Sequence, residues 1–286
     1  MRKSILLIFT ILSSSFCIGQ DSLDFYKNLA KKNYLAKEYA KAMHNYFEAV
    51  KINAEDFESH LGLADSKHKL SLFKPAIDSY NNASEIDNQH AELYFNRGAA
   101  YIFINEFKKA LKDFDHCLEI DPNFSGVYYY KGFANAELNR YKEAISNYNK
   151  AIEFEPNNAA AYYNRGAAKS ELKNYDAGMS DFKIALEKDP NLENGRLNLA
   201  LTKLGMKRYA EAIEELSQII KDNDGDLAKA FYYRAEANYE IKKKELACED
   251  WVKAAKLGHG QASENANSFC GVDKVKQTKK EIEIVF

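Results

Sequence analysis

A repeat with a period of 34 residues constrains this 286-residue chain more than any other feature. Dipeptides that end in proline recur at this interval, at Asp121-Pro122, Glu155-Pro156 and Asp189-Pro190. In the same register the chain divides into seven repeats, which begin at Leu23, Phe57, Ala91, Ser125, Ala159, Glu193 and, after one inserted residue, Ala228. A short unit copied in register predicts a solenoid, in which each repeat packs mainly on its two neighbours.

Small and large side chains occupy fixed positions of the repeat. Position 20 is always small, at Ala42, Ala76, Ala110, Ala144, Gly178, Ala212 and Ala247. Position 24 is always large, at Tyr46, Tyr80, Phe114, Tyr148, Phe182, Leu216 and Trp251. Position 27 is small again in six repeats, and Ile219 is the exception. With only four prolines and thirteen glycines, the chain is too poor in turn residues for an all-β protein, so we predict an all-α fold.

This pattern resembles the tetratricopeptide repeat, a helix hairpin with small residues at positions 8, 20 and 27 and large ones at positions 4, 11, 17 and 24. The resemblance covers residues 23–258 and implies a right-handed α-solenoid of about seven hairpins, each with a helix A and a helix B. Residues 247–262 also resemble the Sel1-like repeat. A last helix over residues 259–270 is predicted to cap the solenoid, and residues 271–286 are predicted to form either a disordered tail or a short strand.

Residues 1–19 have the pattern of a secretory signal peptide, with two basic residues, an apolar stretch and then small residues. Cleavage after Gly19 would make Gln20 the first residue of the mature chain. We therefore expect an exported protein, in the periplasm or outside the cell, that is not inserted in a membrane. Lipidation at Cys17 is disfavoured because Phe16 precedes it, and an uncleaved anchor is disfavoured because a membrane span needs about 20 apolar residues.

Charge and motifs argue against several classes of function. The chain has 40 basic and 42 acidic residues, so no net positive field attracts nucleic acid. The sequence contains no glycine-rich phosphate loop and no HExxH, GxSxG or CxxC motif. Of the six histidines, only His60 and His68 lie close together in sequence, and their spacing is too long to share a metal ion directly. We therefore predict no enzymatic activity, no metal site and no cofactor.

Arginine at position 7 of a repeat coincides with aspartate sixteen residues later. The pairs are Arg97 with Asp113, Arg165 with Asp181 and Arg234 with Asp250. Where position 7 is leucine, the later residue is not aspartate. Because helices A and B run antiparallel, this spacing predicts an ion pair across each of the three hairpins. The alternative is that these arginines bind an anionic ligand.

The family resemblance also implies a binding groove along the A helices. In the family, positions such as 2, 5, 6 and 9 line the inner face, and asparagine at position 6 often holds the backbone of an extended peptide. An amide suits this role because it both donates and accepts hydrogen bonds. Position 6 is asparagine at Asn28, Asn96, Asn164 and Asn198, and the predicted groove is completed by Phe95, Tyr129, Tyr130, Phe133, Tyr163, Leu197, Tyr232 and Tyr233. The alternative is that these asparagines only bond to neighbouring helices.

Two of the four cysteines are predicted to form a disulfide. Cys17 leaves with the signal peptide, and Cys117 occupies the small, buried position 27 of its repeat. Cys248 and Cys270 are equidistant in sequence from His259, where the turn before the capping helix is expected. An antiparallel hairpin brings such residues level, and an exported protein meets an oxidising environment. Two separate reduced thiols are the alternative.

Taken together, these features predict an exported, non-catalytic scaffold that binds a protein or an extended peptide in its groove. The alternative is a structural accessory subunit of an envelope enzyme or transport complex, which shapes an assembly without recognising a peptide. Both hypotheses depend on the family resemblance, because a fold alone does not specify a function.

Overall fold

The structure, a computed structural model, describes residues 21–192 and 194–271. All regular secondary structure in these ranges is α-helical, so the predicted all-α fold is confirmed. The predicted signal peptide, residues 1–19, and residues 272–286 of the predicted tail lie outside the described residues. None of the helices described combines the length and the apolar composition that crossing a bilayer requires.

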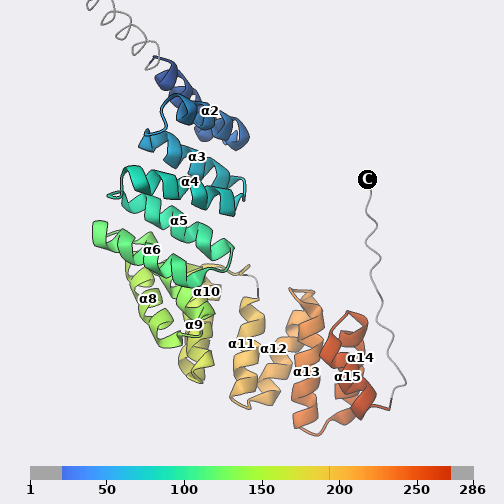
Figure 1. Cartoon of the computed structure of the whole chain (residues 1–286). Coiled ribbons are helices and arrows are strands. Elements are labelled where there is room, and N and C mark those ends of the chain that lie inside the picture. Colours follow the sequence, from blue (N-terminus) through green and yellow to red (C-terminus); the bar gives the residue numbers. More distant parts are fainter. Residues whose placement is uncertain (1–20, 193, 272–286) are drawn as a thin grey trace, which may run out of the picture. The chain divides into compact units, whose positions relative to one another are not determined.

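The described residues form two compact bodies, which divide between Asn139 and Arg140. In the N-terminal body, helical residues 21–35 are followed by α2 (Tyr39–Ile52), α3 (Phe57–Lys69), α4 (Phe73–Ile86), α5 (Ala91–Phe103), α6 (Phe107–Ile120) and α7 (Gly126–Glu137). The C-terminal body contains α8 (Tyr141–Phe154), α9 (Ala159–Glu171), α10 (Tyr175–Lys188), α11 (Gly195–Gly205), α12 (Tyr209–Asp222), α13 (Leu227–Glu240), α14 (Lys244–Lys256) and α15 (Gly260–Phe269) (Figure 1).

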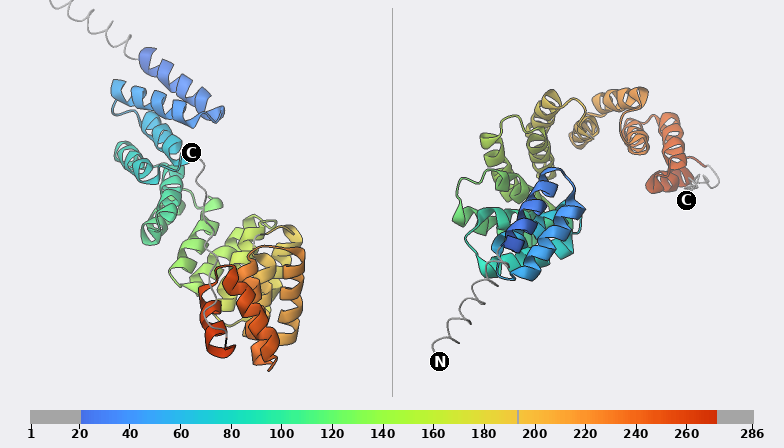
Figure 2. Two further views of the ribbon diagram at one scale, coloured as in Figure 1. Left: turned by 90° about the vertical axis from the view of Figure 1, so that its right-hand side faces the viewer. Right: turned by 90° about the horizontal axis from the view of Figure 1, so that it is seen from above.

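In each body, a helix A is followed by an antiparallel helix B, and this order repeats along the chain (Figures 1 and 2). Five A helices each pack on their own B helix and on the B helix that precedes it, namely α3, α5, α9, α11 and α13. The A helices also contact one another, α3 with α5 and α5 with α7 in the N-terminal body, and α9 with α11 and α11 with α13 in the C-terminal body. Within each body the A helices therefore form one layer, which carries the predicted groove positions.

A residue with left-handed backbone makes the turn between helix A and helix B. Position 15 has a φ between 56° and 64° in all seven repeats, at Lys37, Ser71, Asn105, Asn139, Lys173, Lys207 and Lys242. In six of these turns, the N–H of position 16 donates to the carbonyl of position 11 at 2.8–2.9 Å. This bond satisfies a carbonyl that helix A would otherwise leave unpaired. Because these six turns are the same, helices A and B of the six repeats meet in the same register.

Small side chains allow helices A and B to approach closely. The alanines at position 20 are fully buried, and Gly178 is buried at the same position of repeat 5. A methyl group added to Gly178 would lie 2.8 Å from the carbonyl oxygen of Gly166, which is too close for any side chain. One added to Gly98 would lie 2.6 Å from the ring of Phe114. The small positions recur because the hairpin leaves no room for more atoms there.

The three predicted arginine–aspartate pairs are present, and each is bidentate. The Nε and Nη2 atoms donate to the two carboxylate oxygens at 2.7–2.9 Å, in Arg97–Asp113, Arg165–Asp181 and Arg234–Asp250. Nη1 reaches beyond the hairpin to position 25 of the preceding repeat, at Asn81, Asn149 and Ser217. Each guanidinium also lies 5.2–5.5 Å from the ring centroid at position 4, in Tyr94, Tyr162 and Phe231. These internal contacts disfavour the alternative of an anionic ligand.

Other repeats hold the same helices with a different arrangement of charge. In repeat 4, position 7 is Lys131, whose Nζ donates to Asp115 at position 25 of repeat 3. In repeat 4 the carboxylate therefore lies on helix B of the preceding repeat and not on the repeat's own helix B. Where position 7 is leucine in repeats 2 and 6, a lysine at position 11 binds position 23 instead, in Lys67–Ser79 at 2.7 Å and Lys203–Glu215 at 2.8 Å.

The last helix, α15, packs on α14 and covers the apolar end of the C-terminal body. Trp251 and Tyr239 contact the ring of Phe269 in this helix, with centroids 5.8 Å and 5.3 Å apart. Cys248 and Cys270 form a disulfide, with their Cα atoms 5.6 Å apart. In the chain-entropy account, closing a loop of this length stabilises the cap by about 3 kcal/mol. Cys117 is a buried free thiol.

We expect Arg97→Ala to lower the free energy of unfolding by about 2–4 kcal/mol, because Asp113 would stay buried without a counter-ion. Denaturant unfolding of the protein measures this change. The double variant Arg97→Met/Asp113→Leu, which removes both charges, should lose less than Arg97→Ala. Arg208→Ala is the control, because Arg208 pairs with Glu211 on an exposed surface. Equal losses for Arg97→Ala and Arg208→Ala would contradict a structural role for the clamp.

Candidate functional site

The aromatic residues of the predicted groove lie on the A helices and are half-buried against neighbouring rings. Their nearest ring contacts are Phe95 with Phe124 (centroids 5.0 Å apart), Tyr129 with Tyr130 (5.4 Å), Phe133 with Phe107 (6.3 Å), Tyr163 with Phe182 (5.5 Å) and Tyr232 with Tyr233 (5.1 Å) and His259 (4.2 Å). Each ring therefore packs on a ring of the same or a neighbouring repeat and stays only partly exposed.

Leu197 does not lie in a groove, and this prediction is wrong. Its side chain is only 6% exposed and belongs to a core cluster with Ala200, Leu216 and Ile219. The reason lies one residue earlier. Position 4 is a buried aromatic in repeats 3 and 4, but in repeat 6 it is Arg196, which pairs with Asp222 at 2.9 Å and Asp224 at 3.2 Å on the surface. Leu197 takes the interior place that the arginine leaves.

The four asparagines at position 6 are not equivalent. Asn96 donates through Nδ2 to Asp65 Oδ1 at 3.0 Å, and Asn198 donates through Nδ2 to the Tyr163 hydroxyl at 2.5 Å. Both acceptors lie on the A helix of the preceding repeat, so the alternative of bonds to a neighbouring helix describes these two side chains. Asn164 is half-buried on α9, and Asn28 is exposed and lines a cavity. A regular ladder of asparagines is therefore not present.

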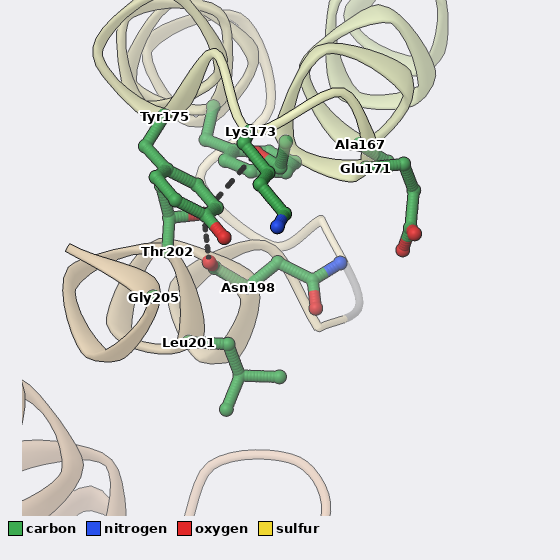
Figure 3. A pocket seen from close by; sticks show the side chains of 10 residues that line it. Ala167, Glu171, Lys173, Tyr175, Asn198, Leu201, Thr202 and Gly205 are labelled. Atoms are coloured by element: carbon green, nitrogen blue, oxygen red, sulfur yellow. Dashed lines mark hydrogen bonds between the residues drawn. The ribbon is translucent and has the colours of Figure 1, made fainter.

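A cavity of about 390 Å³ opens on the A-helix face of the C-terminal body, between α9, α10 and α11 (Figure 3). Asn198 and Leu201, three residues apart on α11, both line it, together with Lys173 from the turn between α9 and α10. Thr202 Oγ1 donates to the carbonyl of Asn198 at 2.8 Å, which holds this segment of α11. The Oδ1 atom of Asn198 accepts no hydrogen bond from the described residues and is available to a ligand. The wall combines an amide, a lysine and an apolar side chain, which suits a polypeptide.

A second cavity, of about 410 Å³, lies on the A-helix face of the N-terminal body. It is bordered by helical residues 21–35, α2 and α3, and Asn28, Tyr34, Tyr46 and Asp65 are among its lining residues. Gly62 lies under the Tyr46 ring, and a methyl group added there would be 2.3 Å from Tyr46 Cζ. Position 6 is therefore glycine in this repeat because an aromatic ring occupies the space of a side chain.

Asp65, at position 9 of repeat 2, receives two hydrogen bonds on one oxygen. The Tyr80 hydroxyl donates to Oδ1 at 2.6 Å and Asn96 Nδ2 donates to the same atom at 3.0 Å. Repeat 7 has the same arrangement, in which Trp251 Nε1 and Asn265 Nδ2 both donate to Glu236 Oε1 at 2.9 Å. An acidic residue at position 9 thus binds a polar aromatic residue at position 24 and an asparagine on the next A helix.

Family models match most of the repeats that this geometry defines. Models described as tetratricopeptide repeat match residues 91–124, 159–192 and 197–266, and one described as TPR repeat matches residues 136–173. The chain is a tetratricopeptide repeat protein. A comparison with curated protein sequences gives no match.

Solved structures of similar fold agree with this assignment of the tetratricopeptide repeat protein. A tetratricopeptide repeat protein from Parabacteroides merdae shares 18% identity at a TM-score of 0.62 and covers 86% of this chain and 98% of its own. MamA shares 24% identity with this chain at a TM-score of 0.56, and the match covers 60% of this chain and 94% of the MamA chain. A chain of the APC/C hetero-tetramer Cut9-Hcn1 shares 17% identity at a TM-score of 0.59, and the match covers 78% of this chain and 45% of that chain. The tetratricopeptide repeat scaffold is typical of protein–protein interaction modules.

The described part of this tetratricopeptide repeat protein contains no group of three or more histidine, cysteine, aspartate and glutamate side chains placed to share a metal ion.

The acidic residues at position 9 were missed from the sequence, although a signal was present. Position 9 is acidic in repeats 2 and 7, where position 24 is Tyr80 or Trp251, and it is alanine in repeats 3 and 5, where position 24 is phenylalanine. Tyrosine and tryptophan carry the donor that an acidic residue accepts. The signal is incomplete, because Tyr46 and Tyr148 at position 24 accompany Lys31 and Phe133 at position 9.

Asp65 is held in a setting that opposes its ionisation. Burial raises the pKa of the Asp65 carboxyl to about 6, although the hydrogen bond from Tyr80 acts in the opposite direction. No basic side chain of the described residues forms an ion pair with it. By contrast, Asp113, Asp181 and Asp250 each have an arginine. An ionised carboxylate that is buried without a counter-ion lowers the free energy of unfolding at neutral pH.

We expect Asp65→Asn to stabilise the folded protein at pH 7.5 but not at pH 4.5. With its pKa raised to about 6, Asp65 keeps its proton in the folded state between about pH 4 and 6 while the unfolded chain loses it, so stability falls as pH rises through this range. The amide retains the acceptor for Tyr80 and Asn96. Thermal unfolding at both pH values should show a gain of about 1–3 kcal/mol at the higher pH only. A pH-independent difference would contradict this account.

Proposed function

We propose that this tetratricopeptide repeat protein is an exported, non-catalytic scaffold that binds an extended segment of another protein on its A-helix face. The observation that carries the proposal is that each body has a cavity on this face, lined by a position 6 asparagine, Asn28 in one and Asn198 in the other. Both cavities combine polar and apolar walls, as peptide-binding surfaces do. The family assignment supports protein binding as the general class of function.

The cavity with Asn198 and Leu201 supports recognition of peptide backbone and side chain together. Asn198 Oδ1 can accept a backbone N–H while its Nδ2 stays bonded to Tyr163, so the amide is oriented before a partner binds. Leu201 offers an apolar contact one helical turn away, and Lys173 adds a positive charge at the rim. A pre-oriented polar group lowers the entropic cost of binding.

The runner-up proposal is a structural accessory subunit of an envelope assembly. The exposed edges of Phe103 and Leu246 favour it, because they lie outside both cavities and suit contact with a folded protein. A stoichiometric subunit would remain bound when a cavity is altered, whereas a recognised segment would not.

Leu201→Glu is expected to reduce capture of partner proteins from the cell envelope at least about tenfold, because a charge would replace the apolar contact in the cavity. Affinity capture with the tagged mature chain, followed by quantitative mass spectrometry, measures this. Leu246→Glu is the matched control, because Leu246 is 47% exposed on α14 and lies outside the cavity. Circular dichroism should show the same helical content for both variants. Unchanged capture by Leu201→Glu would remove the support for the cavity and favour the accessory subunit.

The disulfide supports export, because disulfides persist in oxidising compartments and are rare in the cytosol. We expect protein recovered from cells expressing the full chain to begin at Gln20 and to yield a peptide in which Cys248 and Cys270 are linked. Mass spectrometry of non-reduced peptides measures both features. Free thiols at both positions together with an intact Met1 would contradict export.

A further inference from the structure

The N-terminal cavity presents a carboxylate that lacks a counter-ion inside the protein. Asp65 Oδ1 accepts both hydrogen bonds, from Tyr80 and Asn96, and no described residue donates to Oδ2. The side chain nevertheless lines the cavity, so this second oxygen is the acceptor that a ligand would meet. The other buried aspartates at repeat position 23 each have both oxygens bound by an arginine.

Two tyrosines form the wall beside this carboxylate. Tyr34 comes from helical residues 21–35 and Tyr46 from α2, and both line the cavity with Asp65. Proximity to Asp65 contributes to raising the pKa of each hydroxyl, with burial as the main cause. The Tyr46 ring rests directly on the backbone at Gly62, so it is fixed in place. Aromatic faces beside a carboxylate attract a cation through their quadrupole.

The basic residues of the cavity do not reverse its charge preference. Lys27 is bound by Asp56 at 3.0 Å and by Glu58 at 2.6 Å, so its charge is already neutralised. Lys31 is exposed, and Asp24 also lines the cavity. Lys31 is the lining cation without an ion pair among the described residues, and it forms no bond with Asp65, so a cationic ligand would supply the missing counter-ion.

We propose that this cavity binds an arginine or lysine side chain of the partner segment, which forms an ion pair with Asp65 between Tyr34 and Tyr46. A volume of about 410 Å³ accommodates one long side chain with water. Arginine fits better than lysine, because its planar group stacks on an aromatic ring while it donates to a carboxylate. This inference rests on the proposed binding function and specifies the chemistry of its partner.

The direct test uses a single capped residue as the probe. Acetyl-arginine N-methylamide is titrated into the mature chain labelled with ¹³C-tyrosine, and the ring signals of Tyr34 and Tyr46 are followed by NMR. Acetyl-citrulline N-methylamide, which has nearly the same shape without the charge, and acetyl-glutamate N-methylamide are the comparison probes. We expect the arginine probe to shift both tyrosine signals and to bind about tenfold or more tightly than citrulline.

Two variants locate the binding. Asp65→Asn should weaken binding of the arginine probe at least about tenfold, because it removes the charge and keeps the acceptor for Tyr80 and Asn96. Glu236→Gln is the matched control, since Glu236 accepts an equivalent pair of hydrogen bonds, from Trp251 and Asn265, in the C-terminal body. It should leave binding unchanged.

Equal binding of arginine and citrulline probes, tighter binding of the glutamate probe, absence of any tyrosine shift, or unchanged arginine binding in Asp65→Asn would each overturn the inference. These outcomes differ from failure of the proposed function. A probe that binds through Asp65 while no protein is captured contradicts only the scaffold proposal. If partner proteins are captured but the arginine probe does not bind, only the inference that the cavity binds a cationic side chain is contradicted.

Discussion

Close contact between helices A and B is the constraint on which the rest of the structure depends. It requires an alanine or glycine at the crossing, as at Gly166 and Gly178, where the backbone of one helix meets the other. The left-handed residue at position 15 fixes the turn, so the crossing recurs in register. Side chains at other positions then face the same neighbours in every repeat. Variation at those positions is what distinguishes one repeat from the next.

Charged residues at positions 7, 11, 23 and 25 illustrate this variation. The same space between two helices B and one helix A holds a bidentate arginine clamp in repeat 3 and a lysine paired with the preceding repeat in repeat 4. In both arrangements the carboxylate has a cation, whether it is buried, as Asp113 is, or exposed, as Asp115 is. Asp65 departs from the rule, and its position on the A-helix face is the reason we connect it with a ligand. Residues that cost stability often serve function.

Features within one hairpin were predictable from the sequence, and features between repeats were less so. The ion pair of Arg97 with Asp113 and the pairing of Cys248 with Cys270 follow from spacing across one hairpin, and the fold follows from the repeat together with the family resemblance. The hydrogen bonds of Asn96 and Asn198 depend on which residue the preceding A helix presents, Asp65 in one case and Tyr163 in the other. Leu197 became part of the core because of Arg196 beside it. A rule based on repeat position does not take such neighbours into account. The repeat pattern also does not predict the division into two bodies after Asn139.

The contacts at position 7 also couple one repeat to the next. Arg165 ties repeat 5 to repeat 4 through Asn149, and Arg234 ties repeat 7 to repeat 6 through Ser217. Between repeats 5 and 6, position 7 is Leu199, and the bonds that cross this junction are those of Asn198 with Tyr163 and of Ser170 with Thr202. A stack of repeats behaves as a row of elements coupled to their nearest neighbours. The junction before α11 is therefore held by bonds between A helices, and a change at position 7 that loosens the arginine junctions would leave this one intact.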